Sequence, residues 1–309
     1  MSDMKRLIAK SVRSHTLFSD AASYGLIKLG FADKYLAGLV SMYRSYHWLC
    51  KRFSSECDEL VASSQKAKQA VKNAGSINNQ AWVCWLQGME KAPEIVQICY
   101  ESICYWLEGW DIVVITSDNY SDYADLPEHV VEKWKQGVIT NTHFSDILRL
   151  DLLVRHGGLW LDATTLLTGP LPGYITNNEL FVYRNGWMDT DMIQMASWLI
   201  YTSSPKNIVL QTTRDLLFEY WCHYSYLKNY FLMHMFFRMV SDRCPDEWSK
   251  VSYINQVDNH LLMSELEKPY DAVRIDEIKR LTTVHKLTYK LSEKLETGCT
   301  AYQLAAIFR

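Results

Sequence analysis

The residues best suited to chemistry lie between positions 142 and 168, and the acid Asp162 is central among them. A Gly157-Gly158 pair and the short apolar run from Leu159 to Leu161 precede it, so Asp162 is expected at the exit of a buried strand. Carboxylate oxygens bind divalent cations, and such a cation can neutralise a phosphate group. An isolated aspartate at a strand end is more often a turn residue, so the spacing alone leaves both interpretations open.

Two acid–base pairs lie earlier in the same segment. Asp151 and Arg155 are four residues apart, and we expect an exposed ion pair worth about 0.3–0.5 kcal/mol. Asp146 and Arg149 are three residues apart in a more apolar stretch, where burial costs desolvation unless another polar partner satisfies the pair. A sugar with several hydroxyls would be such a partner, although the spacing alone favours a structural pair.

A helix, a tight turn and a strand must position these side chains. Thr142 is expected as the N-cap of a helix that ends at Arg155 and His156, where Gly157-Gly158 supplies a left-handed stop. One face of this helix is apolar and carries Phe144, Ile147, Leu148 and Leu152.

Upstream, the pattern predicts a strand, a helix and a second strand. Residues 81–86 and 111–116 are short apolar runs, and a helix is expected to begin at Pro93. Strand, helix and strand at this spacing indicate a βαβ unit with a parallel sheet. Ligands gather at the carboxyl ends of such strands, so residues 87–90 and 117–119 are expected to border a site.

The chain divides near residue 76 by composition. Residues 1–75 have a helical pattern that ends in Asn73-Ala74-Gly75-Ser76, a helix stop followed by a loop. We expect an N-terminal helical region of residues 1–75 and one domain of residues 76–309, mostly helical beyond residue 190. The predicted fold class is α/β, with an N-terminal helical extension and a mainly helical C-terminal portion.

Composition narrows the partners and the compartment. The net charge of −3 argues against nucleic acid as the main partner. The eight cysteines form no CxxC pair, which favours reduced thiols in a cytosolic protein, and no apolar run is long enough for a membrane-spanning helix. Residues 1–14 are basic and amphipathic; such a segment can lie on an anionic membrane or pack on the protein, and the pattern favours neither.

The combined motifs resemble a known family. Ser145 to Leu150 reads Ser-Asp-Ile-Leu-Arg-Leu, and Gly157 to Thr164 reads Gly-Gly-Leu-Trp-Leu-Asp-Ala-Thr. With the runs 82–88 and 285–290, they resemble the capsular polysaccharide synthesis family of bacterial glycosyltransferases, relatives of DXD-containing sugar transferases such as yeast outer-chain mannosyltransferases and large clostridial glucosylating toxins. The resemblance covers about residues 78–290. It implies a GT-A-like, Rossmann-type domain that binds a nucleotide sugar.

Carried over residue by residue, the resemblance implies a donor site. Asp146 and Arg149 would contact the donor sugar and, with Asp162, form the catalytic set. Asp162 would be the first acid of the DXD element and would touch metal and ribose. The residues expected to bind the nucleotide sugar are Trp85, Gln87, Asn119, Asp146, Arg149 and Lys286, the last at the diphosphate.

The resemblance also implies a divalent cation, Mn²⁺ or Mg²⁺, held by Asp162, Thr164 and His285. The DXD position here reads Asp162-Ala163-Thr164, and a threonine hydroxyl is a neutral and weaker ligand. The metal would then be held more loosely or through water and phosphate. A literal Asp-x-Asp at residues 189–191 lacks the Gly-Gly and strand context, so we expect it to be unrelated to the metal.

The implied activity is hexose transfer, from UDP-galactose or UDP-glucose, with retention of anomeric configuration. The implied acceptor is a lipid-linked oligosaccharide at the cytoplasmic face of the cell membrane. Two alternatives stay open at this point. One is a transferase that modifies a protein side chain, and the other is a silent domain that binds nucleotide sugar or glycan within an assembly complex.

Overall fold

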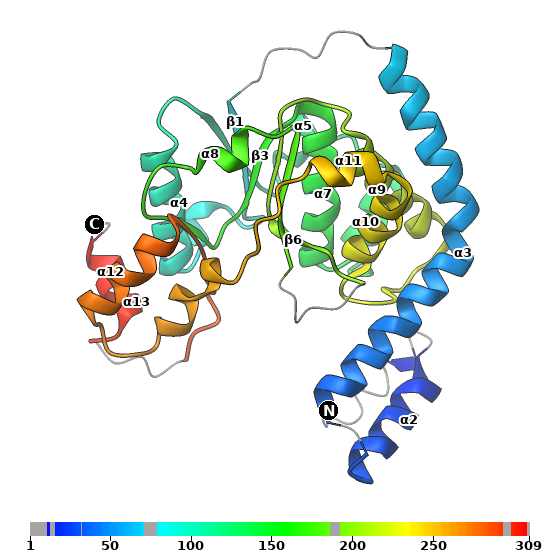
Figure 1. Ribbon diagram of the computed structural model, residues 1–309, viewed down its shortest axis with the longest axis horizontal. Helices are drawn as coiled ribbons and strands as arrows, with labels where there is room; N and C mark the ends of the chain where they lie inside the picture. Colours follow the sequence, from blue (N-terminus) through cyan, green and yellow to red (C-terminus); the bar gives the residue numbers. More distant parts are fainter. Residues whose placement is uncertain are drawn as a thin grey trace.

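A five-stranded mixed sheet lies at the centre of the molecule (Figure 1). The computed structural model describes residues 11–12, 16–31, 33–70, 79–185, 192–292 and 298–307. In spatial order the strands are β2 (Asp111–Ile115), β1 (Gln80–Cys84), β3 (Gly158–Asp162), β6 (Met195–Thr202) and β5 (Leu180–Arg184). β1 pairs in parallel with β2 and β3, whereas β6 runs antiparallel to β3 and β5. The predicted α/β class is confirmed.

The predicted βαβ unit is confirmed, and the helix between its strands is α4 (Glu94–Trp106). The expectation that the chain is mostly helical beyond residue 190 missed β6. Seven of the eight β6 residues are buried, so this strand shows no alternation of polar and apolar positions. Periodicity cannot distinguish such a strand from a buried helical segment.

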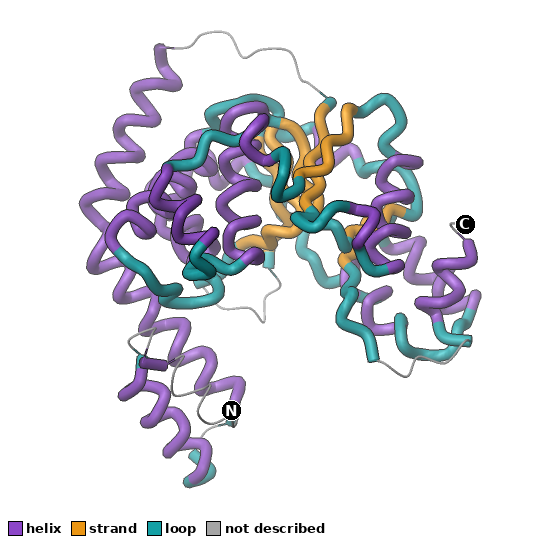
Figure 2. The backbone as a smooth tube through the Cα atoms, turned by 180° about the vertical axis from the view of Figure 1, so that it is seen from behind, coloured by secondary structure: helices purple, strands orange, loops and turns teal. Residues whose placement is uncertain are grey.

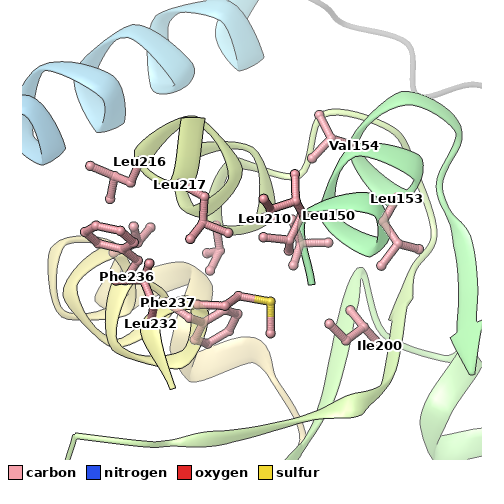
Figure 3. Packing of buried hydrophobic residues seen from close by; sticks show 14 of the residues in the cluster. Leu150, Leu153, Val154, Ile200, Leu210, Leu216, Leu217, Leu232, Phe236 and Phe237 are labelled. Carbon is pink, nitrogen blue, oxygen red and sulfur yellow. The ribbon is translucent and has the colours of Figure 1, made fainter. Parts of the chain in front are cut away.

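Helices cover both faces of the sheet, because successive strand residues point to opposite sides. Trp82, Trp160 and Ile200 face a core formed with α7 (Asn141–His156), α9 (Ile208–His223) and α10 (Leu232–Arg243), part of which Figure 3 shows. Val83 and Leu161 face a second core, formed with α4, α12 (Ala272–Leu281) and α13 (Thr300–Ile307). Figure 2 shows the strands between these two groups of helices.

A small second sheet extends the edge where β3 ends. β4 (Thr165–Leu167) pairs antiparallel with β7 (Val284–Lys286), and the register places Thr165 opposite Lys286. The remaining described elements are short: α5 (Tyr120–Tyr123), α6 (Glu128–Lys135), α8 (Gly173–Thr176), α11 (Pro245–Lys250) and the 3-10 helices Met89–Lys91, Asp258–His260 and Leu262–Glu265.

The N-terminal helices are joined to the rest of the molecule through one long helix. α3 (Lys34–Ala70) is kinked at Phe53, and its second half packs against α9 and α10, where Phe53 and Cys57 are fully buried. α2 (Leu17–Lys28) and the first half of α3 form a hairpin that projects from the body (Figure 1). The predicted boundary near residue 76 falls in the stretch 71–78, outside the described residues.

No described helix is long and apolar enough to cross a membrane. Most of the basic segment 1–14 lies outside the described residues, as does the Asp-x-Asp at residues 189–191.

Two details of α7 differ from expectation. Its N-cap is Thr140, whose hydroxyl accepts from the backbone N–H of His143, rather than Thr142. The prediction that Asp151 and Arg155 form an exposed ion pair is wrong, because the Asp151 side chain is only 1% exposed. Its two carboxylate oxygens lie 2.9 Å from Arg155 Nε and 2.9 Å from Arg214 Nη1. Arg214 comes from α9, so the burial arises from a helix that the local pattern does not include.

Candidate functional site

A pocket of about 670 Å³ opens at the carboxyl ends of β1 and β3, the edge at which parallel strands expose ligand sites. Its lining comes from the segment after β1, the start of α7, the turn after β3, and the stretch after β7. Lining residues with polar or aromatic side chains include Trp85, Gln87, Lys91, Asn141, Ser145, Arg149, Asp162, Thr164, Tyr230, Lys286, Tyr289 and Lys290.

Asp162 lies at the base of this pocket, as the last residue of β3. Its Oδ1 accepts from Trp160 Nε1 at 3.0 Å and lies 3.3 Å from Arg149 Nη2. Its Oδ2 lies 3.2 Å from Lys286 Nζ. Three donors therefore hold an ionised carboxylate whose side chain is 26% exposed.

The predicted pair of Asp146 and Arg149 is buried and lies directly behind Asp162. Arg149 Nη2 is 3.2 Å from Asp146 Oδ1, and His143 Nδ1 is 3.4 Å from Asp146 Oδ2. Burial raises the pKa of the Asp146 carboxyl, but Arg149 and His143 outweigh that effect and leave the pKa below its ordinary value. Arg149 joins both acids, because it contacts Asp146 and Asp162 with the same nitrogen. Arg149 lines the pocket and Asp146 does not.

Lys286 reaches the same point from β7. Its ammonium donates a short hydrogen bond to the hydroxyl of Thr164, in addition to the ion pair with Asp162. The backbone fixes this arrangement: Thr165 is paired with Lys286, and Leu287 N–H donates to the Thr164 carbonyl at 2.8 Å. The sequence-predicted residues Asp162, Thr164 and Lys286 are thus brought together.

His285 is not brought to Asp162. Neighbouring strand residues point to opposite sides, so the side chain of His285 points away from Lys286. It is fully buried, and its Nε2 lies 2.9 Å from Thr168 Oγ1. Burial and the nearby Lys279 charge lower its pKa to about 4, so the imidazole is neutral at pH 7.

The predicted metal shell does not match this donor set. The metal ligands implied by the family resemblance are Asp162, Thr164 and His285. Asp162 and Thr164 both contact the Lys286 ammonium instead. Within the described ranges, no three histidine, cysteine, aspartate or glutamate side chains are grouped to hold a metal ion. The residues present therefore do not fit a protein-held Mn²⁺ or Mg²⁺ of the expected kind.

The predicted nucleotide residues separate into two groups. Trp85 and Gln87 line the pocket, and the Trp85 ring meets Tyr289 edge-on at 5.4 Å between centroids. Asn119 is not among the lining residues. Its side chain accepts from Thr116 N–H and donates to the Val114 carbonyl, so it closes the turn after β2.

Sequence reasoning missed several lining residues. Lys91, Tyr289 and Lys290 line the pocket, and Tyr230 reaches it from the loop before α10. Tyr289 and Lys290 lie within the run 285–290 that carries part of the family resemblance, and this was the available signal. The Tyr230 side chain is 64% exposed, so it is a surface residue at the pocket and not part of the core.

The electrostatics of the lining favour an anion. Four lining side chains are cationic, Lys91, Arg149, Lys286 and Lys290, against the single acid Asp162. Even with Arg149 neutralised by the buried Asp146, an excess of positive charge remains. A pocket with aromatic rings on one side and cationic side chains nearby can bind a planar group that is joined to phosphates.

Comparison with known proteins identifies the family of this chain. The structure combines a mixed α/β fold with a cationic pocket at the strand ends. The chain belongs to the capsular polysaccharide synthesis protein family, whose model matches residues 39–304. It is 26% identical over 128 residues to the O-glycosyltransferase braB of Annulohypoxylon truncatum, covering 38% of this chain and 29% of that protein. The match spans less than a third of that relative's length.

Two solved structures are similar in outline. The PaToxG glycosyltransferase aligns at a TM-score of 0.42 and 14% identity, over 87% of this chain and 98% of that one. A second structure, of a transferase mutant with two cysteines replaced by serine, aligns at a TM-score of 0.35 and 9% identity, over 55% of this chain and 87% of that chain.

Proposed function

We propose that this protein is a glycosyltransferase that moves a hexose from a nucleotide-sugar donor to a glycan acceptor. The observation that carries the proposal is the cluster of Asp162, Thr164 and Lys286 at the base of a cationic pocket. Membership of the capsular polysaccharide synthesis protein family supports it, as does the similarity to a protein named an O-glycosyltransferase.

The donor we propose is UDP-galactose or UDP-glucose. The diphosphate would lie at Lys286, and the base would lie against the rings of Trp85 and Tyr289. Arg149 would contact the sugar directly, with Asp146 behind it fixing its guanidinium. Support for the choice of sugar comes from the family resemblance.

For the chemistry we propose transfer with retention of configuration. Asp162 is the one acid that lines the pocket within the described residues, and Trp160, Arg149 and Lys286 all contact its carboxylate. Both carboxylate oxygens of Asp162 already face these donors, so we propose the departing phosphate oxygen, on which charge develops, as the acceptor for the proton of the attacking hydroxyl. NMR of the product from an α-linked donor should show an α linkage, and a β-linked product would exclude retention.

The first experiment measures UDP, GDP or dTDP release from a panel of nucleotide sugars. We expect turnover with one donor and a loss of about 10²–10³-fold in Asp162→Asn, because the neutral amide no longer holds Lys286 and Arg149 as an anion does. Asp118→Asn is the matched control, since Asp118 is exposed near the end of β2 and outside the pocket lining. Tight binding of a donor without turnover, even with candidate acceptors present, would instead favour a binding scaffold.

We also propose a lipid-linked oligosaccharide as the acceptor, reached at the cytoplasmic face of the cell membrane. The tip of the α2–α3 hairpin exposes large apolar side chains: Leu26, Leu29, Phe31, Tyr35, Leu36 and Val40. Lys28 and Lys34 lie among these side chains in the sequence, as basic residues lie among apolar ones in membrane-surface segments.

The hairpin starts beside the pocket. Tyr230 lines the pocket, its neighbour Asn229 donates to Ser45 of α3, and the Lys228 ammonium lies 5.1 Å from the Trp48 ring centroid. From Ser45 back to Lys34, α3 extends about 17 Å. If the hairpin tip contacts a membrane, an acceptor whose lipid stays in that membrane could therefore place its glycan in the pocket.

A further inference from the structure

The charge arrangement around Asp162 differs from the metal site that the sequence implied. A divalent cation bound by protein oxygens needs several of them, and carboxylates supply the charge that offsets it. Here one carboxylate and one neutral hydroxyl share a single ammonium. Asp146 offsets the charge of Arg149, which also contacts Asp162, and the charges of Asp162 and Lys286 then balance. The oxygens of Asp162 and Thr164 therefore match a lysine ammonium.

The β4–β7 register makes this arrangement stable. Thr165 pairs with Lys286 and Leu166 with His285, so moving His285 to the pocket side requires a one-residue slip of β7. Such a slip would break the hydrogen bond from Leu287 N–H to the Thr164 carbonyl. It would also move the His285 side chain out of its buried position and turn the Lys286 ammonium to that side of the strand.

The ammonium retains a donor for a ligand. Lysine has three N–H donors, and within the described part of the chain Asp162 and Thr164 account for two of them. Its side chain is 20% exposed and lines the pocket, so the third donor is available there. Lys91 and Lys290 line the same pocket and add positive charge around a bound diphosphate.

We propose that the Lys286 ammonium, held between Asp162 and Thr164, neutralises the donor diphosphate in place of a divalent cation. The inference rests on the proposed glycosyl transfer. In that step the bond between sugar C1 and the β-phosphate oxygen breaks, and its electron pair stays on that oxygen. The acceptor oxygen forms the new bond to C1, and its proton passes to the departing phosphate. Lys286 stays protonated and donates a hydrogen bond to the oxygen on which charge develops.

The test compares ligand binding and turnover in EDTA and in Mn²⁺. Calorimetry with UDP and with inorganic pyrophosphate should give wild-type Kd values that agree within about twofold in the two conditions, because no metal ion takes part in binding. Donor turnover should likewise persist in EDTA. In Lys286→Ala, the Kd for both probes should rise about tenfold or more, and donor turnover should fall about 10²–10³-fold.

Three further variants make the result interpretable. Lys286→Arg keeps the charge and should retain more binding than Lys286→Ala. Lys286→Gln keeps most of the length without the charge and should behave like Lys286→Ala, which separates charge from packing. Lys135→Ala, at an exposed lysine of α6, should match wild type. Circular dichroism confirms that each variant is folded.

Two failures are distinguishable. UDP binding and turnover that appear in Mn²⁺ and vanish in EDTA would overturn the role of Lys286 and leave the glycosyltransferase proposal in place. Absence of binding to UDP and pyrophosphate in both conditions, with no turnover of any donor, would overturn the proposed function itself.

Discussion

At the scale of single residues, Asp151 shows how much the surroundings of a side chain change its role. Its carboxylate accepts from Arg155 Nε, Arg214 Nη1 and the backbone N–H of Asp125, each at 2.9 Å. It joins α7, α9 and the loop after α5 while being almost fully buried. Removing the charge of this buried acid destabilises the fold, because Arg155 then keeps only the exposed Asp125 and Arg214 keeps only Asp215.

We predict that Asp151→Asn lowers the free energy of unfolding by about 3 kcal/mol, as expected for a broken buried ion pair. The matched control is Asp125→Asn, which removes the 82% exposed partner of Arg155 and should cost less than about 1 kcal/mol. Urea unfolding at pH 7 measures both. Equal losses in the two variants would contradict the assignment of Asp151 as a buried junction.

How well the role of each residue could be predicted depended on how near its partners lie in the sequence. Asp162, Asp146 and Arg149 stand in a local motif, and the structure places them in one connected cluster. Asp151 looked exposed because Arg214, which buries it, is 63 residues away in the chain. Local spacing carries no information about a partner from a distant helix.

At the scale of elements, β7 decides which of two adjacent residues serves the pocket. The sequence shows His285 and Lys286 side by side, and either side chain could complete a site at Asp162. Alternation along the strand sends them to opposite sides, and the pairing with β4 fixes which one faces Asp162. That register depends on backbone hydrogen bonds between segments about 120 residues apart, which a single sequence does not reveal.

The other elements also differ in how far a local sequence pattern marks them. β1, α4, β2 and α7 were predictable, because their apolar runs and stop signals are local. β6 was not, since its inner position in the sheet buries both of its faces and removes the alternation that would mark a strand.

At the scale of the whole molecule, the two halves of α3 differ in their surroundings: one packs in the core, and the other projects in the hairpin. The second half of α3 is packed in the main core, while the tip of the hairpin exposes Leu29 and Phe31 at 71% and 74%. Exposed apolar side chains of this size contribute to membrane binding when they enter the lipid interface.

We predict that the full chain floats with vesicles that contain anionic phosphatidylglycerol, and that the double variant Leu29→Glu, Phe31→Glu does not. Each apolar side chain transferred contributes about 1.5–3 kcal/mol, so the partition coefficient should fall at least about tenfold. Tyr253→Glu is the control, because Tyr253 is 83% exposed but lies away from the hairpin. Flotation of the double variant equal to wild type would reject the hairpin as the membrane contact, and unchanged donor hydrolysis in it would show that the pocket is intact.

The backbone of β1 leaves no space for a side chain at Gly158, which limits the mutations that this chain tolerates there. Gly158 has φ +93°, and a Cβ built there would lie 2.3 Å from the carbonyl oxygen of Gln80 in β1. Any side chain at this position would push β3 away from β1 and displace Asp162, four residues along the same strand. In a saturation library, position 158 should therefore tolerate as few replacements as the acid itself, although it carries no functional group.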